Sequence, residues 1–133
     1  MNPRHNEVAE RADRRCEYCH APEAIFNFSL EVEHILPLAA GGADSLDNLA
    51  LACRSCNAFK SYRQVGIDAE TGQTAPLFHP RQNVWEEHFI IDNATETLLG
   101  LTPQGRATVA QLQLNSAEQR QARALWRQLQ RFP

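Results

Sequence analysis

Apolar and polar residues follow two different patterns along the first third of the chain. Residues 6–14 interleave charges with small apolar residues, which is typical of a short helix. From residue 26 to residue 35, apolar and polar residues alternate, so this stretch is expected to form a strand. The strand should end near His34, because Pro37 follows and cannot donate to a strand ladder.

A loop, a second strand and a helix are expected next. Residues 38–47 contain the pair Gly41-Gly42, which favours a loop. Residues 48–53 are mostly apolar and predict a second short strand, and residues 55–64 predict a helix. The first half is therefore predicted to run in the order strand, loop, strand, helix.

The second half predicts a linker, a hairpin and two helices. Residues 65–74 are polar and contain glycine, as expected of a linker. Residues 85–91 and 97–101 resemble two strands, and the turn-forming residues 92–96 join them into a hairpin.

Two helix starts are visible after the hairpin. Thr102 followed by Pro103 is typical of an N-cap and first turn, and predicts a helix that runs to about residue 114. Ser116 and Gln119 have the spacing of a capping box and predict a last helix that ends near residue 131.

The last predicted helix has an apolar face and a basic face. The residues expected to face the core are Ala122, Leu125, Trp126, Leu129 and Phe132. The residues expected on the opposite face are Arg120, Arg123, Arg127 and Arg131. This arginine face is interpreted either as a solvated surface or as a surface that contacts the phosphates of a nucleic acid.

The charge of the protein is unevenly distributed along its 133 residues, with a formal net charge of -3. Residues 21–100 hold four Lys or Arg against eleven Asp or Glu, whereas residues 101–133 hold five Arg against one Glu. An acidic middle holds a polyanion poorly unless a metal cation lies there. Any affinity for nucleic acid must therefore come from local patches.

The sequence shows no segment for insertion into a membrane. No stretch has the length and apolarity of a transmembrane helix, and the first residues lack the apolar run of a signal peptide. We therefore expect a cytoplasmic protein with no membrane partner. In that reducing compartment, paired cysteines are expected to be metal ligands and not disulfides.

All four cysteines occur in two short pairs, Cys16-x-x-Cys19 and Cys53-x-x-Cys56. Two such pairs that close one loop have the spacing of a tetrahedral four-cysteine Zn²⁺ site. Iron bound as in a rubredoxin would use the same four ligands, so the identity of this structural metal stays open from the spacing alone.

A further set of polar residues lies in the loop that the cysteine pairs close and just after it. The set comprises Glu33-His34-Ile35-x-Pro37, Gly41-Gly42, Asn48-Leu49, Asn57 and Lys60. Together with the cysteines, it resembles the HNH (His-Asn-His) endonucleases. The resemblance implies a ββα-metal, treble-clef-like core and a metal-dependent endonuclease that cuts DNA, leaving 5′-phosphate and 3′-hydroxyl ends. Asn57 replaces the commoner histidine of the family, and Glu33 replaces the commoner aspartate.

The chemistry of phosphodiester hydrolysis assigns roles to three of these residues. His34 is expected to be the general base, because the pKa of an unperturbed histidine lies near neutrality. Glu33 and Asn57 offer two hard oxygen ligands, which suit a catalytic Mg²⁺ or Mn²⁺. The alternative is a treble-clef zinc module without catalysis that binds nucleic acid or protein.

Two more residues are given supporting roles. Asn48 is expected to hydrogen-bond backbone groups across the loop and so to hold His34. Lys60, one helical turn after Asn57, is expected either to contact a phosphate or to be solvated. The overall prediction is an α+β protein, with a zinc-stapled nuclease core at residues 1–64 and a hairpin-plus-helices extension at residues 65–133.

Overall fold

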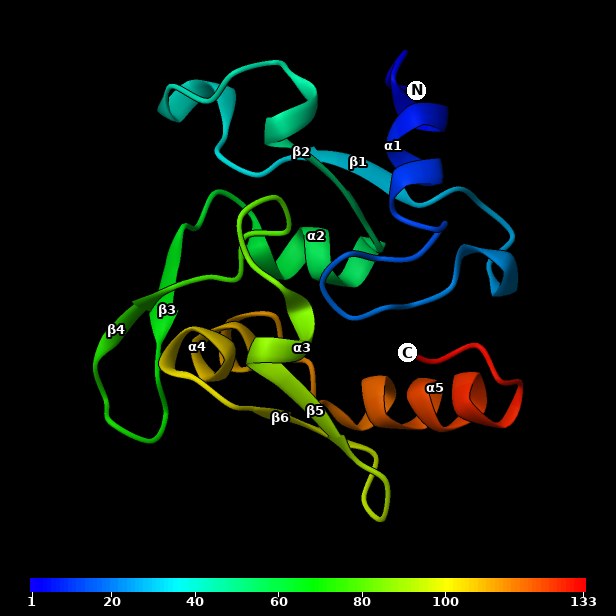
Figure 1. Ribbon diagram of the computed structural model, residues 1–133, viewed down its shortest axis with the longest axis vertical. Coiled ribbons are helices and arrows are strands. Elements are labelled where there is room, and N and C mark those ends of the chain that lie inside the picture. The colour runs from blue at the N-terminus through cyan, green and yellow to red at the C-terminus, as the bar shows by residue number, and fades with distance from the viewer.

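The structure is a computed structural model that describes residues 1–133, and it has the predicted α+β class. The helices are α1 (His5–Arg11), α2 (Arg54–Lys60), α3 (Trp85–His88), α4 (Pro103–Gln111) and α5 (Ala117–Gln128). The strands are β1 (Glu31–His34), β2 (Leu49–Ala52), β3 (Val65–Ile67), β4 (Thr74–Pro76), β5 (Phe89–Asp92) and β6 (Thr97–Gly100). In Figure 1, α2 lies between the β1–β2 pair and the group formed by α3, α4, β5 and β6.

The strands pair into three separate two-stranded antiparallel sheets, β1–β2, β3–β4 and β5–β6. In the first sheet, Glu31 lies opposite Ala52 and His34 lies opposite Leu49. The strand predicted for residues 26–35 is therefore wrong over its first five residues. β2 offers only four partner residues, and the backbone N–H of Leu30 donates instead to the carboxylate of Glu23.

The chain after α2 differs from its prediction. The helix ends at Lys60, and Ser61 takes a positive φ of 50°. The predicted linker at residues 65–74 is wrong, because it carries β3 and the start of β4. Gly66 of β3 lies against the backbone of α4 with little room for a Cβ. This hairpin therefore depends on packing against a helix about 40 residues later, which a local pattern does not reveal.

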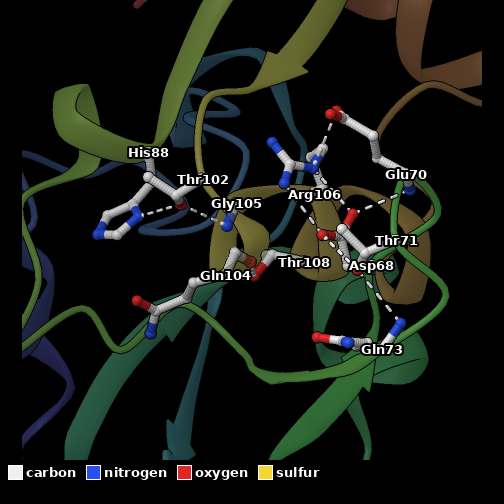
Figure 2. A network of polar contacts seen from close by, with 10 residues as sticks. All are labelled: Asp68, Glu70, Thr71, Gln73, His88, Thr102, Gln104, Gly105, Arg106 and Thr108. Carbon is white, nitrogen blue, oxygen red and sulfur yellow. Dashed lines mark hydrogen bonds and ion pairs between the residues drawn. The ribbon is translucent and has the colours of Figure 1, made fainter.

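The polar network in Figure 2 fixes the β3–β4 hairpin to α4. Arg106 donates from Nε and Nη2 to the two carboxylate oxygens of Asp68, at 2.8 and 3.0 Å. Asp68 also accepts from the backbone N–H of Glu70 and the hydroxyl of Thr71. Because Asp68 is fully buried, these donors compensate its desolvation.

The second hairpin and both helix caps agree with the sequence. β5 pairs with β6 around the turn at residues 92–96, although residues 85–88 form α3 and not the start of a strand. Thr102 accepts from the N–H of Gly105, and Ser116 accepts from the N–H of Gln119. A Cβ at Gly105 would overlap the carbonyl oxygen of His88, so this close helix–hairpin contact requires glycine.

The hydrophobic core is continuous across both halves of the chain. One cluster of 21 buried residues joins the four cysteines to Phe78, Phe89 and Trp126 of the second half. The indole N–H of Trp85 donates to the carbonyl of Tyr18 at 2.9 Å, and Gln111 of α4 donates to the carbonyl of Phe59 in α2.

No helix has the length and apolarity needed to span a membrane.

The two faces predicted for α5 are partly wrong. Trp126 is buried, but Leu125 and Leu129 are 58% and 60% exposed. Arg123 is fully buried, so the arginines do not form one exposed stripe. The inner face of the helix instead carries polar Gln119 and Arg123 beside Trp126, at a spacing of four and three residues.

The four arginines predicted for the last helix lie in three different environments, and Arg131 lies beyond the end of α5. Arg123 donates to the carbonyl oxygens of Glu96 and Leu114, both at 2.6 Å. Arg127 pairs with the carboxylate of Glu96 at 2.5 Å. The remaining two, Arg120 and Arg131, are exposed and form no ion pair. Arg123 is therefore a structural residue and does not reach a phosphate.

Candidate active site and four-cysteine metal centre

The four cysteines converge on one buried point. Their Sγ atoms all lie within 4.8 Å of one another, and all four residues are buried. The backbone N–H of Cys19 points at the Sγ of Cys16, and the N–H of Cys56 points at the Sγ of Cys53. Each short pair thus forms a tight turn that directs two sulfurs to the same side.

The geometry of this cluster fits Zn²⁺. Four sulfurs at about 2.3 Å from a tetrahedral ion lie about 3.8 Å apart, and the Sγ atoms of Cys19 and Cys53 are separated by 3.7 Å. Hydrogen bonding with Cys16 and burial raise the pKa of Cys19 and of Cys56. Four thiolates in this buried space therefore require a cation, and all four ligands expected from the sequence are present.

A separate pocket of about 400 Å³ lies where the end of β1 meets α2. Its lining residues are Glu33, His34, Pro37, Leu38, Asn57, Ser61 and Tyr62. The three residues that the sequence assigned to catalysis thus share one pocket, although adjacent Glu33 and His34 belong to opposite faces of a regular strand. A larger hollow of about 630 Å³ is lined mainly by apolar side chains and contains no histidine.

The imidazole of His34 is oriented by a carboxylate. Its Nε2 lies 3.0 Å from Oδ1 of Asp44, in the loop between β1 and β2. The hydrogen bond with His34 lowers the pKa of Asp44, so this carboxylate is charged at neutral pH. A charged carboxylate accepts and does not donate, so it fixes the proton on Nε2 and leaves the lone pair on Nδ1 of His34.

Asn48 makes the cross-loop hydrogen bonds expected from the sequence. Its amide accepts from the N–H of Leu36 and donates to the carbonyl of Leu36, both at 2.9 Å. It also donates to the carbonyl of Ala43 at 2.7 Å. A Cβ at Gly42 would overlap the carbonyl oxygen of Leu36, so the loop closes this tightly only with glycine there. Asn48 therefore braces the segment that follows His34.

Glu33 is held in the protein interior by two donors. It accepts from the hydroxyl of Tyr18, and Nζ of Lys60 lies 3.3 Å from its second carboxylate oxygen. Burial raises the pKa of Glu33, whereas Lys60 and Tyr18 act in the opposite direction. Burial also raises the pKa of Tyr18, so its hydroxyl stays protonated and donates.

Lys60 does not have either of the roles expected from the sequence. It is 1% exposed, and its Nζ donates to the carbonyl of Ile35 at 2.8 Å as well as to Glu33. A buried ammonium group with these partners neither contacts a phosphate nor is solvated. Its position instead compensates the charge of Glu33.

Asn57 faces the pocket from the second turn of α2. Its Nδ2 donates to Oε2 of Glu31 at 2.6 Å, and Arg54 lies 3.6 Å from the other oxygen of Glu31. Because the amide nitrogen is engaged by a carboxylate, Oδ1 of Asn57 remains as the acceptor atom available to a cation.

Tyr18, Glu31 and Asp44 belong to the site but were missed by sequence reasoning. Glu31 lies two residues before Glu33, so the alternation of a strand places both on the same face. Asp44 is an acid within the cysteine-closed loop, which was a usable signal. No local pattern reports that Tyr18 reaches Glu33, because the two residues meet only through the fold.

A short antiparallel strand pair followed by a helix on a four-cysteine frame defines a ββα-metal domain. Residues 16–63 match the family model described as HNH endonuclease, so this segment is an HNH endonuclease domain, as the resemblance implied. The family indicates nuclease activity and a nucleic acid substrate. A search of curated proteins finds no match to the chain.

Proposed function

We propose that the protein is a divalent-ion-dependent endonuclease that hydrolyses phosphodiester bonds of DNA. The observation that carries this proposal is the common pocket of Glu33, His34 and Asn57 beside the four-cysteine centre. A domain that only bound nucleic acid would have no need for a histidine whose tautomer is fixed by a carboxylate.

His34 activates the attacking water. As the oxygen of the water bonds to phosphorus, its proton passes to Nδ1 of His34, and the bond from phosphorus to the 3′-oxygen breaks. Asp44 accepts the Nε2–H throughout this step and stabilises the imidazolium that forms. Asn48 contributes by holding the segment after His34 in place.

Glu33 and Asn57 are the residues that would hold the catalytic ion. A carboxylate and an amide oxygen are hard donors, and this set suits Mg²⁺ or Mn²⁺ better than Zn²⁺. Such an ion, when bound, stabilises negative charge on the phosphate and on the leaving oxygen. Each oxygen of Glu33 keeps a free lone pair beyond its bond to Tyr18 or Lys60, so coordination is compatible with both contacts.

Plasmid cleavage tests this function directly. Pure zinc-loaded protein is incubated with supercoiled plasmid without added metal, with Mg²⁺ and with Mn²⁺. We expect nicked or linear product only with the added ion. His34→Ala should lower the rate by about 10²–10⁴-fold, as expected for loss of a general base.

His79→Ala is the matched control, because His79 is partly buried and lies outside the pocket. It should cut at the wild-type rate. A folded His34→Ala protein that cuts as fast as the wild type would refute the assignment of the base. Binding of DNA without cleavage under all metal conditions would support a non-catalytic zinc module instead.

A further inference from the structure

An exposed aromatic ring stands at the rim of the catalytic pocket. Tyr62 is 70% exposed and lines the same pocket as His34 and Asn57. It lies two residues after the end of α2, and the N–H of the intervening Ser61 donates to the carbonyl of Asn57 at 3.0 Å. The ring is therefore attached to the helix that carries Asn57, at a fixed place beside the proposed scissile phosphate.

Two neighbours of Tyr62 complete a nucleotide-sized platform. The guanidinium carbon of exposed Arg63 lies 5.7 Å from the centroid of the Tyr62 ring, and Arg63 forms no ion pair. Leu38 lines the same pocket from the loop after β1 and is 53% exposed. An aromatic ring and an aliphatic side chain thus line the pocket, and an unpaired cation lies beside the ring. This combination binds bases and phosphates of a single strand.

The charge around the pocket is too balanced for phosphate contacts alone to bind DNA there, so base stacking must supply much of the affinity for DNA. Three carboxylates, of Glu31, Glu33 and Asp44, lie at or beside the pocket. The nearby cations are buried Lys60, Arg54, Arg63 and Arg4, which donates to the carbonyl of Asp44. Charge at this site is thus close to balanced, unlike the basic grooves that bind duplex DNA through its phosphates.

We propose that Tyr62 and Arg63 form a stacking platform for an unpaired base next to the scissile phosphate. In a duplex both faces of each base are covered by neighbouring bases, so only an unpaired nucleotide can place a face on Tyr62. The substrate class is therefore DNA with an unpaired nucleotide at the cleavage point, such as a single strand, a flap or a bulge. This inference rests on the proposed nuclease function.

A binding assay separates this inference from catalysis. The non-cutting His34→Ala protein is titrated, by fluorescence anisotropy, into a labelled single strand, its full duplex and the same duplex with a single-nucleotide bulge. We expect the single strand and the bulged duplex to bind more tightly than the full duplex. Adding Tyr62→Ala should weaken binding of the single strand by about 5–150-fold, the effect of losing one stacked base.

Two further variants sharpen the test. Tyr62→Phe keeps the aromatic face and should keep the affinity of the parent. Arg63→Gln should reduce the slope of log affinity against log salt by about 0.7 on the single strand, as expected for one phosphate contact.

The platform is refuted if Tyr62→Ala leaves all three affinities unchanged or weakens the full duplex as much as the single strand. In that case cleavage of plasmid by the wild type would still support the nuclease function. Selective loss on the unpaired DNAs together with a wild type that never cuts would support the platform and refute the nuclease.

Discussion

Replacing Arg123 by methionine should destabilise the fold, although arginines of surface helices usually contribute little. The guanidinium is fully buried and donates to the carbonyls of Glu96 and Leu114 at 2.6 Å and to Asn115 at 3.3 Å. Methionine has a similar length, so the main loss is the hydrogen bonding of these three acceptors. A hydrogen bond from a charged donor contributes about 1.5–3 kcal/mol, and the partly buried bond to Glu96 lies at the low end of that range.

Part of that cost is offset by removing a buried charge. Burial lowers the pKa of Arg123, which shows that the interior disfavours its charged form. We therefore expect a net loss of about 2–4 kcal/mol, against a total stability of about 7–20 kcal/mol for a chain of this length. Urea unfolding of zinc-saturated protein, followed by tryptophan fluorescence, measures the loss, because Trp126 lies on the same face of α5.

Arg120→Met is the matched control, because Arg120 lies on the same helix, is exposed and forms no ion pair. Its free energy of unfolding should stay within about 0.5 kcal/mol of the wild type. An Arg123→Met protein equally close to the wild type would show that the buried contacts contribute no net stability.

Three further predictions concern the metal sites and the α4 network. Tyr18→Phe removes one donor to Glu33, so half-maximal cleavage should need roughly ten times more Mg²⁺. Metal analysis should find unchanged zinc content. An unchanged Mg²⁺ requirement would contradict a role of this contact in ion binding. Cys53→Ser, or chelation of the structural metal, should unfold the protein by circular dichroism, because a structural zinc site contributes on the order of 10 kcal/mol; a folded, zinc-free protein would refute this. Arg106 lowers the pKa of Asp68, so the stability that this carboxylate adds is present above about pH 4 and is lost as the pH falls further. The difference in free energy of unfolding between the wild type and Asp68→Asn, measured by urea unfolding, should therefore decrease only below that pH. Release of zinc at low pH affects both proteins alike and cancels in this difference.

Features set by short stretches of sequence were the predictable ones. The turns of the two cysteine pairs and the N-caps at Thr102 and Ser116 each depend on residues three positions apart. The side-chain amide of Asn48 is also set by near neighbours, because its backbone partners lie within 12 residues in the same loop. Such contacts form in nearly any surrounding structure, so their residue types predict them.

Features set by distant partners were not predictable. Arg123 is buried because α5 packs beside the carbonyls of the β5–β6 turn and of the segment after α4, which no helical period can indicate. Lys60 points inward because Glu33 and the carbonyl of Ile35 accept hydrogen bonds from its ammonium group. In both cases tertiary hydrogen bonds compensate the desolvation of a charged side chain that is usually exposed. These contacts override the exposure that the charge pattern of the helix predicts.

The position of Tyr18 implies that the protein must bind its structural metal before it can bind a catalytic ion. Tyr18 lies between Cys16 and Cys19, so the turn that the structural metal closes also carries the hydroxyl that holds Glu33. A chain that has not yet acquired that metal has no fixed support for Glu33, the proposed ligand of the catalytic ion. Under the proposed function such a chain is inactive, so the supply of the structural metal limits how many molecules can use the catalytic ion.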